Sequence, residues 1–128
     1  MRNKQFRFKL MAMAAAGVAL GAPGLANAGM VVNNMVTVNT AVDSVDASPG
    51  DGLCEDANGR CSLRAAVMEA NALPGANTIA LRPQLYRLRL AGKSEDAAAT
   101  GDLDVTDTLT IIGNGSVIDG ANVDRIFD

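Results

Sequence analysis

Three aspartates near the C-terminal end of the sequence are the first candidates for chemistry. Glycoside hydrolysis uses two carboxylates held at a defined separation, and Asp102, Asp104 and Asp107 offer such groups. On a strand, Asp102 and Asp104 would project from the same face. They also alternate with Leu103 and Val105, and this period of two favours outward, solubilising charges beside a buried apolar face.

Two arginines form a second candidate pair. Arg87 and Arg89 alternate with apolar residues and so would share the outer face of a strand. They could recognise an acidic sugar, and a β-eliminating lyase could use an arginine as its base, but a solvated strand face is the more ordinary interpretation. The sequence contains no histidine, which excludes a Ser-His-Asp triad and a histidine-ligated metal within this chain. We therefore predict no catalytic residue and no metal site.

An acidic loop precedes and includes the cysteine region. Its carboxylates are Asp43, Asp46, Asp51, Glu55 and Asp56. Calcium prefers several oxygen ligands, but the order D-x-N-G at 56 to 59 does not fit an EF-hand loop. We therefore favour a solvated acidic loop and expect no cofactor, with calcium as the alternative.

Residues 1 to 28 have the pattern of a secretory signal peptide. Four basic residues precede the apolar run Leu10 to Leu20, and Ala26-Asn27-Ala28 supplies small residues for cleavage. The run is shorter than the roughly 20 residues that span a bilayer, and we expect no transmembrane segment after signal cleavage. We predict a secreted, periplasmic or cell-surface location in a bacterium.

Cleavage would also change the charge of the chain. The signal segment holds 4 of the 11 Lys and Arg residues and no acidic residue, so 7 basic residues would remain against 14 Asp and Glu, a net charge near −7. Such a surface repels phosphate backbones, so nucleic acid is not an expected partner.

Export determines how the two cysteines are interpreted. In an oxidising compartment, Cys54 and Cys61 are expected to form a disulfide. By the chain-entropy relation, closing this loop would stabilise the fold by about 2.5 kcal/mol at most. The C-x6-C spacing does not suit a redox pair, and no third cysteine completes a zinc site.

A short helix is predicted directly after the second cysteine. Ser62 is a suitable N-cap, and an apolar stripe at i, i+3, i+4 and i+7 is formed by Leu63, Ala66, Val67 and Ala70. Arg64 and Glu69 fall on the side we expect to be polar, and Leu73-Pro74-Gly75 ends the helix. A helix of about two and a half turns is too short to be stable alone, so its stripe must cover an apolar surface.

Short strands separated by Gly, Asn and Asp corners are expected in the rest of the chain. They fall within residues 30–39, 77–81, 86–90, 103–105, 109–112 and 117–118. Winding parallel β-structure is favoured because aromatic residues are scarce and aliphatic pairs such as Ile111-Ile112 and Val117-Ile118 suit corners facing a narrow core. Periodicity alone leaves an antiparallel sandwich open.

The stretch TVNTAVDSVDASPGDGLCEDANGRCSLRAAVMEANALPGANTIAL, residues 37 to 81, closely resembles the CSLREA domain of secreted bacterial proteins with parallel β-helix repeats. Residues 101 to 128 look like the first coils that follow such a domain. The resemblance implies a mainly β fold, the start of a right-handed parallel β-helix with a short capping helix. Residues 29–76 would form the cap and residues 77–128 the first coils. Where the family motif has Glu, this chain has Ala65, so half of a capping box is missing.

Two functions follow from this resemblance. In the first, the chain is the non-enzymatic N-terminal cap and first coils of a secreted or cell-surface β-helix protein. In the second, it is the leading fragment of a polysaccharide-degrading lyase or hydrolase whose active site lies beyond residue 128. The expected partners are polysaccharide or cell-surface components, together with missing C-terminal coils or a second chain at the open end of the solenoid.

Overall fold

The computed structural model describes residues 29–93, 95–121 and 125–128; the predicted signal segment, residues 1–28, lies outside them. In chain order the described elements are β1 (Gly29–Met30), β2 (Met35–Thr37), β3 (Leu53–Cys54), α3 (Leu63–Ala72), β4 (Asn77–Ala80), β5 (Leu85–Arg87), β6 (Leu109–Ile112) and β7 (Val117–Asp119). This part of the chain is mainly β with one helix, as predicted. It includes no helix long and apolar enough to cross a membrane.

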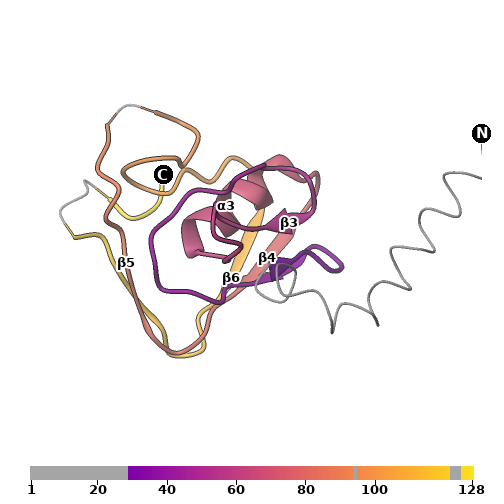
Figure 1. Ribbon diagram of the computed structural model, residues 1–128, viewed down its shortest axis with the longest axis horizontal. Helices are drawn as coiled ribbons and strands as arrows, with labels where there is room; N and C mark the ends of the chain where they lie inside the picture. The colour runs from indigo at the N-terminus through magenta and orange to yellow at the C-terminus, as the bar shows by residue number, and fades with distance from the viewer. Residues whose placement is uncertain (1–28, 94, 122–124) are drawn as a thin grey trace, which may run out of the picture.

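Most of the strands pair in parallel. One sheet has the order β2-β4-β6 and a second consists of β5 and β7, with every pair parallel. A single parallel bridge joins Leu103 to Phe127, and the short β1–β3 pair is antiparallel. In Figure 1, β6 lies along β4, and the chain around β7 follows the chain around β5. The antiparallel sandwich is therefore wrong for these sheets.

Corner residues connect one turn of the chain to the next. Asn114 and Gly115 both have positive φ angles, 51° and 82°, which a side chain larger than Asn rarely tolerates. The side-chain amide of Asn114 donates a hydrogen bond of 2.8 Å to the carbonyl of Leu81, which lies in the preceding turn of the chain. The Asn-Gly corner therefore both turns the chain and links the two layers.

The core follows the alternation expected of strands. Ile79, Leu81, Tyr86, Leu88 and Leu103 are all buried, and the hydroxyl of Tyr86 is satisfied by the backbone of Arg82. The aliphatic pairs behave differently from our expectation, because only one member of each pair faces the core. Ile112 and Val117 are 39% and 59% exposed, since strand alternation continues up to the corner.

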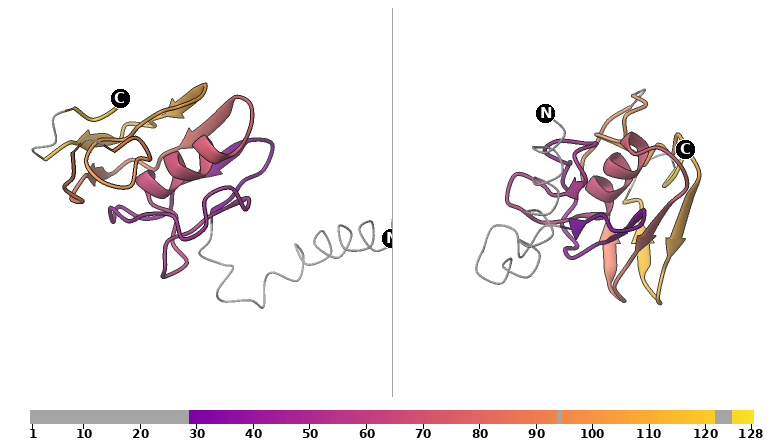
Figure 2. Two further views of the ribbon diagram at one scale, coloured as in Figure 1. Left: turned by 90° about the horizontal axis from the view of Figure 1, so that it is seen from above. Right: turned by 90° about the vertical axis from the view of Figure 1, so that its right-hand side faces the viewer.

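Helix α3 lies between the N-terminal loops and the first parallel layer. It contacts β3 on one side and β4 on the other. Both views in Figure 2 place β6 and β7 on the far side of this layer from the helix and from the chain before β3. The helix is thus covered on both sides, whereas the layer that contains β6 and β7 is covered on one.

Candidate functional site

The disulfide loop at the start of the helix is tightly organised. Cys54 and Cys61 are bonded with an S–S distance of 2.06 Å and are fully buried, which confirms the predicted disulfide. Within the loop, the carboxylate of Asp56 accepts hydrogen bonds from the backbone N–H groups of Asn58 and Arg60 and from the Arg60 side chain. The hydroxyl of Ser44 donates a further bond to it at 2.8 Å.

These bonds determine the ionisation of Asp56. Burial acts to raise its pKa, but the hydrogen bonds from Arg60, Ser44 and Asn58 outweigh burial and hold the pKa below its usual value. Asp56 is only 4% exposed, so the expectation of a fully solvated acidic loop is wrong at this residue. The carboxylate organises the loop that the disulfide closes.

Ser62 begins the helix. Its Oγ accepts a hydrogen bond of 2.9 Å from the N–H of Ala65 and donates one to the carbonyl of Ser44. The cap therefore also ties the helix to the acidic loop. Ala65 is fully buried, so the position where the family motif has Glu is a core position in this chain.

The apolar stripe of the helix is buried, but so is the side we expected to be polar. Leu63, Ala66, Val67 and Ala70 are at most 5% exposed, while Arg64 and Glu69 are both 0% exposed. The prediction of a solvated polar side is therefore wrong for these two residues. The physical reason is that the N-terminal loops cover this side of the helix and supply polar partners to both charges.

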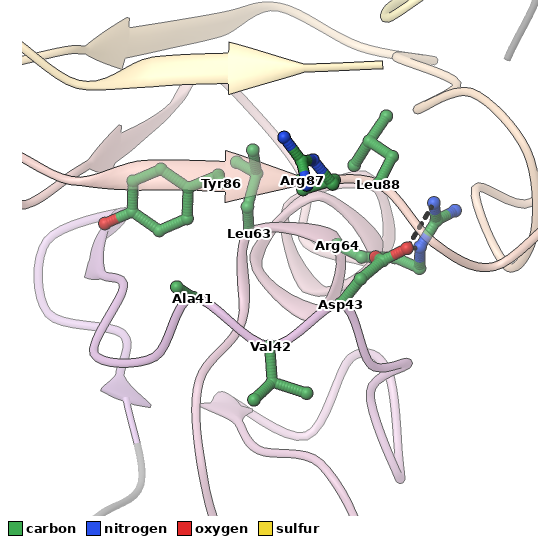
Figure 3. Close-up of a pocket in the computed structure, with 8 residues that line it drawn as sticks. All are labelled: Ala41, Val42, Asp43, Leu63, Arg64, Tyr86, Arg87 and Leu88. Atoms are coloured by element: carbon green, nitrogen blue, oxygen red, sulfur yellow. Dashed lines mark hydrogen bonds and ion pairs between the residues drawn. The ribbon is translucent and has the colours of Figure 1, made fainter. Parts of the chain in front are cut away.

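Arg64 joins four segments of the chain. Its guanidinium forms an ion pair with Asp43 at 2.6 Å and donates hydrogen bonds to the carbonyls of Ala98 and Gly101 at 2.8 and 2.7 Å. Figure 3 shows the ion pair beside β5. The carboxylate of Asp43 in turn accepts the backbone N–H groups of Arg89 and Leu90. A buried arginine is tolerated here because its donors meet a carboxylate and carbonyl oxygens.

Glu69 holds the glycine-containing part of the acidic loop. Its two carboxylate oxygens accept the backbone N–H groups of Gly50 and Gly52, the second at 2.6 Å. Both glycines have positive φ angles, 97° and 89°, a backbone conformation that glycine adopts readily. Glu69 therefore fixes this loop against the helix.

Asn71 connects the end of the helix to the segment after residue 103. Its side-chain amide donates to the carbonyl of Asp104 at 2.7 Å and accepts from the N–H of Thr106 at 3.1 Å. Asn77 binds three carbonyls at the helix exit through its amide nitrogen, those of Ala70, Leu73 and Gly75. The helix is thus attached to the coil by polar contacts at both of its ends.

The candidate carboxylates are brought together in part. Oxygens of Asp102, Asp104 and Asp128 lie within 4.8 Å of one another, whereas Asp107 is not in this cluster. Arg125 pairs with Asp102 at 3.7 Å and with Asp128 at 2.9 Å. The single arginine thus pairs with two of the three clustered carboxylates.

Asp104 itself is not a solvated surface charge. It is 6% exposed, and its Oδ2 accepts the N–H of Ala98 at 3.0 Å. Burial raises its pKa, and the nearby charges of Asp102 and Glu95 act in the same direction. The outward interpretation is wrong here because residues 102–105 form only one bridge, not a regular strand.

The two candidate arginines, Arg87 and Arg89, make different contacts. The side chain of Arg87 forms an ion pair of 2.8 Å with Asp119 on the neighbouring strand β7, and both groups are partly exposed. Arg89 has an exposed side chain, and its backbone N–H binds Asp43. The ion pair engages the guanidinium of Arg87 with the carboxylate of Asp119, so the geometry does not favour Arg87 as a base.

One small cavity lies beside the buried ion pair (Figure 3). Its lining residues include Asp43, Arg64, Leu63, Tyr86 and Leu88. Its volume is about 10 Å³, which is about the space that one water molecule requires. The cavity is too small to hold a sugar.

Comparison with protein-family models, with curated proteins and with solved structures gives no significant match. The residues that organise this region, Asp43, Arg64, Glu69 and Asn71, were not predicted as site residues. The available signal was that three of them stand within the C-S-L-R and E-A-N stretches that carry the family resemblance.

Proposed function

We propose that residues 29–76 form the cap at one end of a right-handed parallel β-helix, that residues 77–128 form its first coils, and that the chain serves a secreted bacterial protein of the CSLREA-domain type. This role is structural and not enzymatic. The support comes from the parallel pairing, the position of the helix and the different burial of the two layers.

The β4–β6 pair and the β5–β7 pair share one offset. Asn77 pairs with Leu109 and Leu85 pairs with Val117, an offset of 32 residues in both pairs. A constant offset in two separate parallel sheets is what stacked coils of one winding chain would produce. Met35 also pairs in parallel with Thr78, so the first coil has a neighbour on each side in this sheet.

The observation that carries the proposal is the contrast in burial between equivalent positions. Ile79 and Tyr86 are 0% and 2% exposed, whereas their register partners Ile111 and Ile118 are only half-buried. Among the described residues, the helix side of the stack is covered and the β6–β7 side is open. We propose that further coils or a second chain cover this open side, because unpaired strand edges with apolar neighbours promote association.

An association experiment tests the open side. We expect the chain to associate with increasing concentration in sedimentation velocity measurements, and Ile118→Asp to suppress the association because Ile118 faces the core. Leu85→Asp is the matched control, since Leu85 is 46% exposed on the outer face of β5. Equal behaviour of the two variants would count against the proposal.

The non-enzymatic role has its own test. Incubation with polyuronides and neutral polysaccharides, followed by absorbance of unsaturated products and by reducing-end assays, should show no turnover. Turnover that Arg87→Ala abolishes would instead overturn the non-enzymatic role of this chain. Among the described residues, the clustered aspartates are paired with Arg125 or with backbone N–H groups.

A further inference from the structure

Asp46 is a buried carboxylate in the middle of the acidic loop. Asp46 is only 5% exposed, whereas its neighbour Val45 is 38% exposed. Oδ1 accepts the N–H of Ser48 at 2.8 Å, but Oδ2 is buried without a hydrogen-bond partner. Burial of an ionised carboxylate oxygen with no donor is unfavourable, whereas a protonated carboxyl group loses much less on burial.

The charged groups that act on Asp46 are acidic. Glu69 approaches from helix α3 and Asp51 from the same loop, and both oppose ionisation. Burial is the largest cause and, with these two charges, raises the pKa of Asp46 to about 6, although the N–H groups of Ser48 and Glu55 act against the shift. Glu69 cannot turn away easily, because its oxygens hold Gly50 and Gly52.

We propose that loop 44–56 is an acid-tightened clasp on helix α3, in which protonated Asp46 lets the loop close against Glu69 and ionised Asp46 loosens it. The two carboxylates hold adjacent parts of one loop, Ser48 by Asp46 and Gly50 by Glu69, so a change at Asp46 acts directly on the loop that covers the helix. The inference does not depend on how the open side of the stack is covered.

The direction of the pH effect follows from linkage. Because the pKa of Asp46 in the native protein, about 6, is above the ordinary aspartate value of 3.8 in the unfolded chain, its protonation stabilises the fold fully below the unfolded pKa. This stabilisation is lost as pH rises through 6. From these two values, the unfolding equilibrium constant should rise about tenfold between pH 5 and pH 7.

Equilibrium unfolding of the full chain in urea at pH 5 and pH 7 tests the proposal. Asp46→Asn imitates the protonated group, so the part of the change that comes from Asp46, about tenfold, should disappear, and only the smaller pH dependence from other buried carboxyl groups such as Asp104 should remain. The matched control Asp107→Asn changes an exposed aspartate and should retain the tenfold change. An unchanged pH dependence in Asp46→Asn, or its loss in Asp107→Asn, would overturn the proposal.

A local measurement separates the clasp from general destabilisation. Amide hydrogen exchange of Gly50 and Gly52, corrected for intrinsic rates, should be slower at pH 5 than at pH 7, while that of Ile79 in β4 should change less. If Asp46→Asn fails to fold, NMR titration of the Asp46 carboxyl carbon in the unchanged chain decides the matter. A midpoint near 6 supports the clasp, and a midpoint near the ordinary aspartate value of 3.8 contradicts it.

Discussion

Arg64 and Asp43 form an ion pair in which the side chains are 0% and 2% exposed. The pair connects helix α3 to the loop before β3 and, through further hydrogen bonds, to the backbone at Arg89 and Ala98. Such a pair contributes little net stability, because burial of both charges offsets much of their attraction. Its main effect is to specify which segments of the chain meet. The cost appears when one partner is removed and the other stays buried alone.

Arg64→Ala should therefore lower the free energy of unfolding by about 3–5 kcal/mol, since it leaves the carboxylate of Asp43 buried with only N–H donors. Urea unfolding followed by circular dichroism measures the loss. Arg87→Ala is the matched control: its side chain and that of its partner Asp119 are 44% and 36% exposed, and such a pair contributes at most about 1 kcal/mol. Similar losses in both variants would contradict the central position we give to Arg64.

Glu69→Ala should be nearly as costly as Arg64→Ala. It leaves the N–H groups of Gly50 and Gly52 without their acceptor, and a hydrogen bond to a charged group contributes about 1.5–3 kcal/mol. We expect a loss of about 3 kcal/mol or more in the same unfolding assay, together with faster exchange of both glycine amides. Glu55→Ala, at a half-buried position of the same loop, should change these exchange rates little. A larger change of the rates in Glu55→Ala than in Glu69→Ala would refute the assigned role of Glu69.

Asp56 should make the fold sensitive to strong acid. Hydrogen bonds hold its native pKa below the ordinary aspartate value of 3.8 despite burial, so its contribution to stability is present above this unfolded value and is lost as pH falls through the lower native pKa. Asp56→Asn should therefore flatten the acidic side of the stability profile below about pH 4. Thermal unfolding between pH 2 and pH 5 measures this slope, and a slope equal to that of the parent chain would show that Asp56 does not contribute.

Local sequence signals were sufficient for the short elements. The predicted disulfide is present between Cys54 and Cys61, and the helix expected after Ser62 covers Leu63–Ala72. These features depend on neighbours within a few residues, such as the bond from Ala65 N–H to the Ser62 hydroxyl. Capping and apolar spacing are visible in the sequence because they involve residues close together in the chain.

The polar contacts of the helix could not be predicted in the same way. Arg64 meets Asp43, 21 residues before it, and Gly101, 37 residues after it. Periodicity assigns a charged residue to the solvent side because burial of an unpaired charge is costly, and it contains no information on distant partners. For the same reason Asp46, Asp56 and Asp104 were expected at the surface although each is buried.

The carboxylate cluster shows the same limit. Its members Asp102 and Asp104 are close in sequence, but Asp128 joins them only through the parallel bridge between Leu103 and Phe127. Asp107, which the sequence grouped with them, lies outside the cluster. Spacing along one segment could predict that Asp102 and Asp104 lie close together. Only the pairing of two segments brings Asp128 to them.

The central claim is that a capped first layer is stacked in parallel under a second layer. Disulfide trapping between the two layers tests this claim most directly. Thr78 and Thr110 are register partners in β4 and β6, and neighbouring strands bring Cα atoms within the range that a disulfide bridges. We predict that Thr78→Cys combined with Thr110→Cys forms a cross-link on mild oxidation, detected as a linked peptide by mass spectrometry, while Thr78→Cys combined with Thr106→Cys does not. Failure of the first pair to link, or equal linking of both pairs, would contradict the stacked arrangement.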